Sequence, residues 1–320
     1  MGIRAGLIVA VPACAVLLVT ASAAPRLAAQ EPEAPQVFRS QASGVAVDVS
    51  VRQGSRPVSD LKASDFVLLD NGVKQQIAEV SYERLPIDVA VALDVSSSVS
   101  GATLDRLRQS IDQLRTRLRD GDRLKLMTFN IRVHRVIDFT DRSVDTRQVF
   151  GTLSGTGGTS LFDALSVALT SATPPDRRQL VIVFTDGQDT SSFLTAKSLA
   201  ELVRRSTPTI DFVRPALAER YQVNIARADG QTSSVARPGA ETDMWRLHRQ
   251  IAADTGGVVL DSAATNLADS FASVLDYFRS SYVLRYTARG ANEPGFHTIT
   301  VQVTRSGTFD IHARRGYFAD

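Results

Sequence analysis

Cysteine is almost absent from this 320-residue chain, which contains one, Cys14. A single thiol excludes an internal disulfide framework and a cysteine-rich zinc site. Lysine is scarce too, since the chain contains only four. The net charge of the chain is only +2. The sequence has no basic block and no array of basic and aromatic residues, so we do not expect nucleic acid as a partner.

The sequence also lacks the common catalytic signatures. No G-x-S-x-G motif precedes a helix, and the glycine-rich segment 155–160 has no P-loop lysine, which argues against an acyl-transfer nucleophile and a nucleotide site. No histidine has metal-ligand spacing to another, and we expect each to lie on a surface or a sheet face; they are His134, His248, His297 and His312. We predict that the protein is not an enzyme, the alternative being a metal-dependent hydrolase with Asp189 as its base.

Residues 1–29 are typical of a secretory signal peptide. Arg4 precedes an apolar stretch, and sites of the Ala-x-Ala kind follow at Ala23 and Ala29. We favour cleavage, which predicts an exported protein, periplasmic or secreted. Two alternatives stay open: the segment is retained as a membrane anchor, or Cys14 carries a lipid. We expect no membrane contact except through such an uncleaved segment.

Alternating strands near both ends of the chain predict a small antiparallel β-sandwich. Residues 45–51 alternate between apolar and polar, and 66–82 is typical of a hairpin that turns at Asn71-Gly72. Further strands are expected at 282–286, 297–303 and 308–314. Because each group is too small to be stable alone, we predict one sandwich from 37–85 plus 281–320. Two separate β units are the alternative.

Residues 86–280 alternate between apolar strands and amphipathic helices. This pattern predicts an α/β domain with a doubly wound, mostly parallel sheet, inserted into the sandwich. We expect a buried strand at 89–93, an antiparallel edge strand at 133–139 and a short helix at 143–153. The long polar segment 216–242 is expected to contain a hairpin, and is either an insertion that contacts a partner or a mobile loop.

Two of the buried strands end in acids. Asp94 ends one strand and is followed by Ser96 and Ser98, Asp186 ends another, and Thr159 lies in a glycine-rich loop before a helix. Since the carboxyl ends of parallel strands lie at one edge of the sheet, these side chains can meet. Two carboxylates and three hydroxyls suit a hard divalent cation and leave one coordination position open. Taken alone, Asp94 and the serines could instead cap a helix.

The neighbouring polar residues have simpler interpretations. Ser160, or else Thr159, is expected to cap the helix that follows. Ser97 is expected to point away from its two serine neighbours as a loop hydroxyl. Asp189 could stiffen its loop or assist the site from outside.

The spacing D-x-S-x-S, then Thr, then Asp before Gly resembles the von Willebrand factor type A (VWA) domain with its metal-ion-dependent adhesion site, as found in secreted bacterial proteins. The likeness covers roughly residues 86–280. It implies that Ser96, Ser98 and sometimes Thr159 bind the ion directly, that Asp94 and Asp186 often act through water, and that a partner's Asp or Glu completes the shell. The implied function is metal-dependent protein binding or adhesion. Mg²⁺ is favoured, with Mn²⁺ and Ca²⁺ open; the alternative is a scaffold of an envelope complex whose metal only stabilises it.

Overall fold

The computed structural model describes residues 44–82, 85–99, 101–141, 155–171, 174, 176–187, 189–215, 222–226, 232–236, 243–263, 266–291 and 293–319. The predicted leader 1–29, the predicted helix 143–153 and the turn of the 216–242 segment lie outside these residues. Within them, no helix combines the length and apolar character needed to cross a bilayer.

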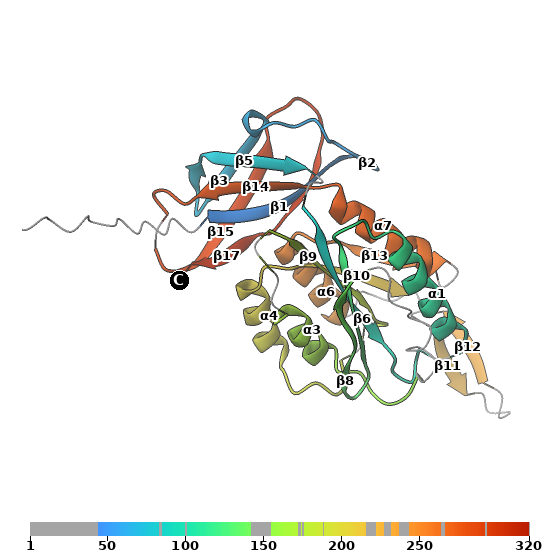
Figure 1. The fold of residues 1–320 in the computed structure, drawn as a ribbon. Coiled ribbons are helices and arrows are strands. Elements are labelled where there is room, and N and C mark those ends of the chain that lie inside the picture. Colours follow the sequence, from blue (N-terminus) through green and yellow to red (C-terminus); the bar gives the residue numbers. More distant parts are fainter. Residues whose placement is uncertain are drawn as a thin grey trace, which may run out of the picture. The chain divides into compact units, whose positions relative to one another are not determined.

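Strands from the two ends of the chain pair with one another in two antiparallel sheets (Figure 1). Their bounds are β1 Gly44–Gln53, β2 Arg56–Pro57, β3 Phe66–Asp70, β4 Val73–Gln75, β5 Ile77–Tyr82, β14 Tyr282–Thr287, β15 Gly295–Val303, β16 Asp310–Ala313 and β17 Gly316–Ala319, with a 3-10 turn η1 at Ala63–Asp65. One sheet has the order β16-β1-β14-β5, with β2 beside β1, and the other has the order β17-β15-β3-β4. Val47, Leu68 and Tyr282 are among the buried residues between them.

The hairpin at Asn71-Gly72 forms as predicted, with φ values of 48° and 81°. Its second arm, however, is not one strand. β4 stays beside β3, whereas β5 crosses to the other sheet and pairs with β14. Gln75 marks the break, because its buried side-chain amide donates to the carbonyl of Arg289 at 3.1 Å and fixes the chain there. The sequence analysis also missed the short strand β17.

The middle of the chain forms a six-stranded sheet with the order β13-β10-β9-β6-β7-β8. The strands are β6 Ile87–Asp94, β7 Arg123–Phe129, β8 Val133–Thr140, β9 Arg178–Phe184, β10 Thr209–Pro215 and β13 Val259–Ser262, and the helices are α1 Ala102–Thr116, α3 Leu161–Leu169, α4 Ala196–Arg205, α6 Asp243–Thr255 and α7 Leu267–Arg279. All neighbouring strands are parallel except β8, which is an antiparallel edge. The predicted fold class is confirmed.

Helices cover both faces of this sheet (Figure 1). α1 and α7 share one core with the sheet, and α3, α4 and α6 share the other, as expected for a doubly wound fold. A separate two-stranded ribbon, β11 Gln222–Ala226 with β12 Thr232–Ala236, confirms the hairpin predicted in the polar segment. The domain boundaries at residues 86 and 280 stay a prediction.

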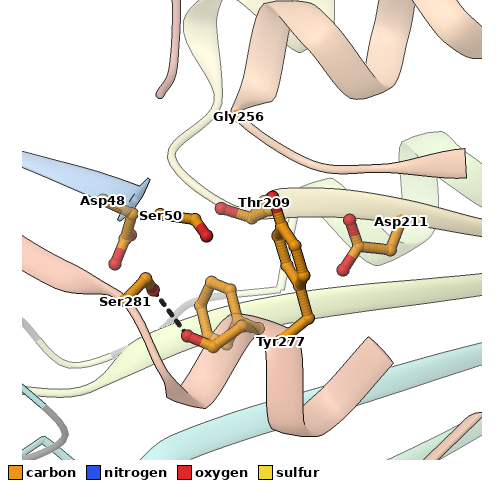
Figure 2. Close-up of a pocket in the computed structure, with 8 residues that line it drawn as sticks. Asp48, Ser50, Thr209, Asp211, Gly256, Tyr277 and Ser281 are labelled. Atoms are coloured by element: carbon orange, nitrogen blue, oxygen red, sulfur yellow. Dashed lines mark hydrogen bonds between the residues drawn. The ribbon is translucent and has the colours of Figure 1, made fainter. Parts of the chain in front are cut away.

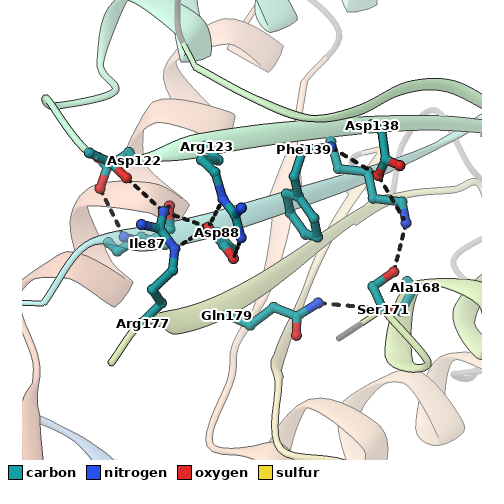
Figure 3. A network of polar contacts seen from close by, with 12 residues as sticks. Ile87, Asp88, Asp122, Arg123, Asp138, Phe139, Ala168, Ser171, Arg177 and Gln179 are labelled. Carbon is teal, nitrogen blue, oxygen red and sulfur yellow. Dashed lines mark hydrogen bonds and ion pairs between the residues drawn. The ribbon is translucent and has the colours of Figure 1, made fainter. Parts of the chain in front are cut away.

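The amino end of β6 carries a buried acid that is fully neutralised (Figure 3). The Asp88 carboxylate accepts hydrogen bonds from Nε of Arg123 at 2.8 Å and Nε of Arg177 at 2.6 Å. Burial alone would raise the pKa of Asp88, but the two guanidinium groups bring it below the usual value. Buried charges are generally paired in this way.

A buried arginine, Arg178 on β9, joins the sheet to the sandwich. Nε of Arg178 lies 2.6 Å from Oδ1 of Asp48 on β1, and Nη2 donates to the carbonyl of Phe278 and to the hydroxyl of Ser281. The guanidinium also lies over the Phe278 ring, 3.9 Å from its centroid.

The expectation that every histidine lies on a surface or a sheet face was wrong for one of them, and a second lies on a sheet face that is buried. His248 on α6 is fully buried and stacks on Phe212 with 4.4 Å between ring centroids. His297 is buried in the sandwich, where Nδ1 lies 2.7 Å from the buried Asp70 carboxylate. An imidazole can be buried when a ring or an acid partners it, and periodicity alone does not reveal such a partner.

Candidate metal site

Two neighbouring parallel strands deliver the acids to the same edge of the sheet. β6 and β9 pair along their whole length, up to Leu93 opposite Phe184. Asp94 is the last residue of β6 and is completely buried, whereas Asp186 follows β9 and is half-buried. The sequence-predicted acids therefore follow adjacent strand ends.

Short polar contacts surround the Asp94 carboxylate. Its Oδ1 accepts from the amide of Ser96 and its Oδ2 accepts from the hydroxyl of Thr185, both at 2.9 Å. The hydroxyls of Ser96 and Ser98 lie 3.0 Å apart. Thr185 was not predicted, although its place beside an acid at a strand end could have indicated it.

The loop that carries Thr159 is tied to the loop that carries the serines. The amide of Thr156 donates to the carbonyl of Val95 at 3.0 Å, and both the amide and the hydroxyl of Ser97 donate to the carbonyl of Gly157 at 3.1 Å. Ser97 is thus the predicted loop hydroxyl. A Cβ on Gly155 would lie 2.0 Å from the carbonyl oxygen of Val99, so only glycine permits this approach.

A third loop, residues 189–194, holds the Thr159 loop from the other side. Oγ1 of Thr190 accepts from the amide of Thr159 at 2.9 Å, and the carbonyl of Thr159 accepts from the amides of Thr190 and Ser191. Thr159 itself is buried, with 4% of its surface exposed. Its main chain is therefore fixed by the strand end that also carries Asp186.

The contacts at the start of α3 show that the capping role predicted for Ser160 was wrong, and they show which of the two roles considered for Asp189 applies. Ser160 occupies the N-cap position, but its hydroxyl makes no capping bond. Asp189 and Ser192 cap the helix instead: each accepts from the amide of Phe162, at 2.9 and 3.1 Å, and the Ser192 hydroxyl donates to Asp189 at 2.6 Å. Asp189 therefore stiffens the loop. A cap from a distant loop leaves no local sequence signal.

The electrostatics of the site differ from those at the other end of β6. Burial is the main factor that raises the pKa of Asp94 to about 6, and the nearby charge of Asp186 raises it further, while hydrogen bonds from Ser96 and Thr185 oppose the change. Within the described residues, neither Asp94 nor Asp186 forms an ion pair with Lys or Arg. The two acids are thus close enough for their charges to interact, and the described residues supply neither with a basic partner.

The donor set fits a hard divalent ion. It contains two carboxylates and the hydroxyls of Ser96, Ser98 and Thr159, all of them oxygen donors, which Mg²⁺, Mn²⁺ and Ca²⁺ prefer. Among the described residues, no three His, Cys, Asp or Glu side chains gather into a metal-binding group. A metal at this edge of the sheet would therefore depend on hydroxyl ligands.

The family comparison agrees with the topology. The sequence model of the von Willebrand factor type A domain matches residues 88–225, which include the strand ends at Asp94 and Asp186 and the loop at Thr159. This chain contains a VWA domain. The match covers less than half of the chain, and it ends before α6, β13 and α7.

Two curated proteins resemble parts of the VWA domain and its surroundings. The E3 ubiquitin-protein ligase WAVH1 of Arabidopsis thaliana is 33% identical over 126 residues, which are 33% of this chain and 18% of the ligase. An uncharacterized protein of Synechocystis is 24% identical over 171 residues, 51% of this chain and 41% of that protein. The chain spans less than half the length of either relative.

Among solved structures, a von Willebrand factor type A protein from Catenulispora acidiphila is 14% identical, with a TM-score of 0.46 over 86% of this chain and 73% of that one. Proximal thread matrix protein 1 from the mussel byssus, solved with a zinc-occupied MIDAS motif, is 16% identical, with a TM-score of 0.48 over 66% of this chain and 50% of that one. The assignment of the VWA domain rests on the family match and the strand order.

Proposed function

We propose that the VWA domain is a metal-dependent protein-binding module of an exported protein. A divalent cation, Mg²⁺ in the first instance, is held by Asp94, Ser96, Ser98, Thr159 and Asp186. The ion supplies an open coordination position for an Asp or Glu carboxylate of a protein partner. The observation that carries the proposal is the contrast along β6: Asp88 has two arginines, whereas Asp94 is equally buried and has a second acid beside it.

The arrangement supports binding better than hydrolysis. A hydrolase would need a general base next to the ion. Asp189, the one candidate from the sequence, already accepts hydrogen bonds at both carboxylate oxygens, from Phe162 and from Ser192. We therefore expect no turnover of ester, peptide or phosphoester substrates with Mg²⁺ present, and sustained turnover by the wild type but not by Asp189→Ala would overturn this part of the proposal.

Export of the protein is part of the same proposal. It rests on the predicted signal peptide, residues 1–29, and on the sequence pattern alone. The partner would then be met outside the cytoplasm, in the periplasm or beyond the cell.

Isothermal titration with Mg²⁺ tests the site itself. The wild type is expected to bind one ion, and Asp94→Ala is expected to lose binding while its circular dichroism spectrum is unchanged. Glu201→Ala is the control, since Glu201 is an acid that lies exposed on α4, where it pairs with Arg205. Equal Mg²⁺ affinity in all three proteins would refute the site.

A partner screen with and without EDTA then separates adhesion from scaffolding. In an adhesion module, capture of a partner requires the metal and fails in Asp94→Ala. In a scaffold with a purely stabilising metal, capture persists in EDTA as long as the protein stays folded.

A further inference from the structure

A small cavity lies where strands β1 and β10 meet helix α7 (Figure 2). Ser50 and Asp48 line it from β1, Thr209 and Asp211 from β10, and Tyr277 from α7. Its free volume is about 10 Å³, which is about the space that one water molecule requires.

Three buried oxygen atoms from residues lining this cavity make no hydrogen bond of good geometry among the described residues, although the hydroxyls of Ser50 and Tyr277 lie close enough to interact with each other. They are Oγ of Ser50, Oδ2 of Asp211 and the hydroxyl oxygen of Tyr277. Buried polar atoms are nearly always paired with protein or with ordered water, because leaving them unpaired costs free energy. The two hydroxyls cannot satisfy each other completely and Oδ2 of Asp211 is left over, which points to one shared partner in the cavity.

The charges around the cavity favour a neutral ligand over a cation. Asp48 is already paired with Arg178 at 2.6 Å, and the buried Arg314 guanidinium also interacts with the Asp48 charge. Burial raises the pKa of Asp211 to about 7, so near neutral pH the carboxyl both donates and accepts. Water can meet either state, because it donates two hydrogen bonds and accepts two.

We propose that this cavity binds one internal water molecule, which hydrogen-bonds to Ser50, Asp211 and Tyr277. The water would link a sandwich strand to a strand and the last helix of the VWA domain. It is independent of the metal site at the other end of the sheet.

A crystal structure of the full chain at a resolution that shows ordered water is the direct test. We expect a density peak within hydrogen-bond distance of Ser50 Oγ, Asp211 Oδ2 and the Tyr277 hydroxyl. An empty cavity would overturn the proposal.

Thermal unfolding of variants gives a second test, in which a cavity with water and a dry cavity predict changes in Tm of opposite sign. If the water is present, Tyr277→Phe and Ser50→Ala each remove one of its partners, and Tm falls by about 2 °C or more. If the cavity is dry, the double variant Ser50→Ala/Tyr277→Phe removes both hydroxyls and leaves neither unpaired, so its Tm is unchanged or rises, whereas with the water present its Tm falls. Ser59→Ala, at an exposed serine, is the control and should leave Tm unchanged.

The double variant Ser50→Ala/Tyr277→Phe distinguishes a shared water from two separate local effects. A shared water predicts that the second substitution costs clearly less than it does alone, because the water has already been weakened. Strictly additive losses would contradict a single bridging molecule.

Discussion

Asp88 and Asp94 lie on the same strand and are both fully buried, yet their environments differ. The first has its charge matched by Arg123 and Arg177, so it belongs to the framework of the fold. The second has hydroxyls, an amide and another acid around it. At the scale of single residues, this contrast within the described chain is the basis on which Asp94 is proposed as a metal ligand.

Asp211 offers a pH-dependent prediction. Burial raises its pKa from 3.8 to about 7, so between about pH 4 and pH 7 the folded chain retains a proton that the unfolded chain has lost. The unfolding free energy therefore falls as pH rises through this window, by at most roughly 4 kcal/mol. Asp211→Asn removes this dependence and keeps an oxygen for the amide of Val258, which now donates at 2.6 Å.

Urea unfolding at pH 4.5 and pH 8 measures this effect. The variant should be more stable than the wild type at pH 8 and close to it at pH 4.5. A difference that is the same at both pH values would show that Asp211 is charged throughout the range.

Asp189 is expected to act on metal binding through Thr159. Its carboxylate caps α3 and fixes the loop whose Thr190 hydroxyl accepts from the amide of Thr159. Second-layer residues of this kind typically change metal affinity ten-fold or more. We expect Asp189→Ala to weaken Mg²⁺ binding about ten-fold in a calorimetric titration and to leave the helix content unchanged. Asp189→Asn should recover part of the affinity, which a purely structural loss would not predict.

At the scale of elements, three loops meet at one edge of the sheet and hold one another through main-chain contacts. At Gly155 the Thr159 loop packs directly against the backbone of the serine loop. A methyl group there would lie 2.0 Å from the Val99 carbonyl oxygen and 3.0 Å from that of Ser96. Backbone cannot give way by that amount without moving the serines.

Gly155→Ala is therefore expected to lower both stability and metal affinity. Overpacking of this kind costs about 1–3 kcal/mol, and displaced serine hydroxyls should weaken Mg²⁺ binding. Gly44→Ala is the matched control, because a methyl group at Gly44 meets nothing within 4 Å. Thermal unfolding with and without Mg²⁺ measures both effects, and a Gly155→Ala protein with wild-type Tm and the same Mg²⁺-induced shift would contradict this account.

Elements whose signal is local could be predicted from the sequence. The apolar run before Asp94 and the Asn71-Gly72 turn both formed as expected, because periodicity and turn chemistry act over a few residues. The crossing of the chain after Gln75, the cap from Asp189 and the burial of His248 depend on partners far along the chain. That Asp94 and Asp186 follow adjacent strand ends could be predicted because the ends of parallel strands share one edge, whereas the contact between Thr185 and Asp94 was not predicted.

At the scale of the whole described chain, Arg178 is a buried polar link between the sandwich and the VWA domain. It is 4% exposed, and it bonds to Asp48, Ser281 and the carbonyl of Phe278. Removing one partner of a buried pair leaves the other unpaired. We expect Arg178→Met to lower the unfolding free energy by about 3 kcal/mol, at the low end of the usual range, because Asp48 keeps some contact with water.

Chemical denaturation of Arg178→Met beside Arg135→Ala tests this link. Arg135 pairs with Asp138 at the surface, where both side chains are more than half exposed, and its loss should cost less than about 1 kcal/mol. Similar losses in the two variants would mean that the buried link contributes no more than a surface pair.

Strand β5 ends at Tyr82, before the six-stranded sheet begins, and β14 starts at Tyr282, after α7, and these two tyrosines face each other across the β5–β14 pair. A pull from a protein attached to the VWA domain would therefore reach the sandwich at two adjacent points. It would load β5 and β14 in the same direction, so the hydrogen bonds between them would bear little shear. Tension applied instead between the ends of the sandwich would bypass the inserted domain, which would stay mechanically sheltered.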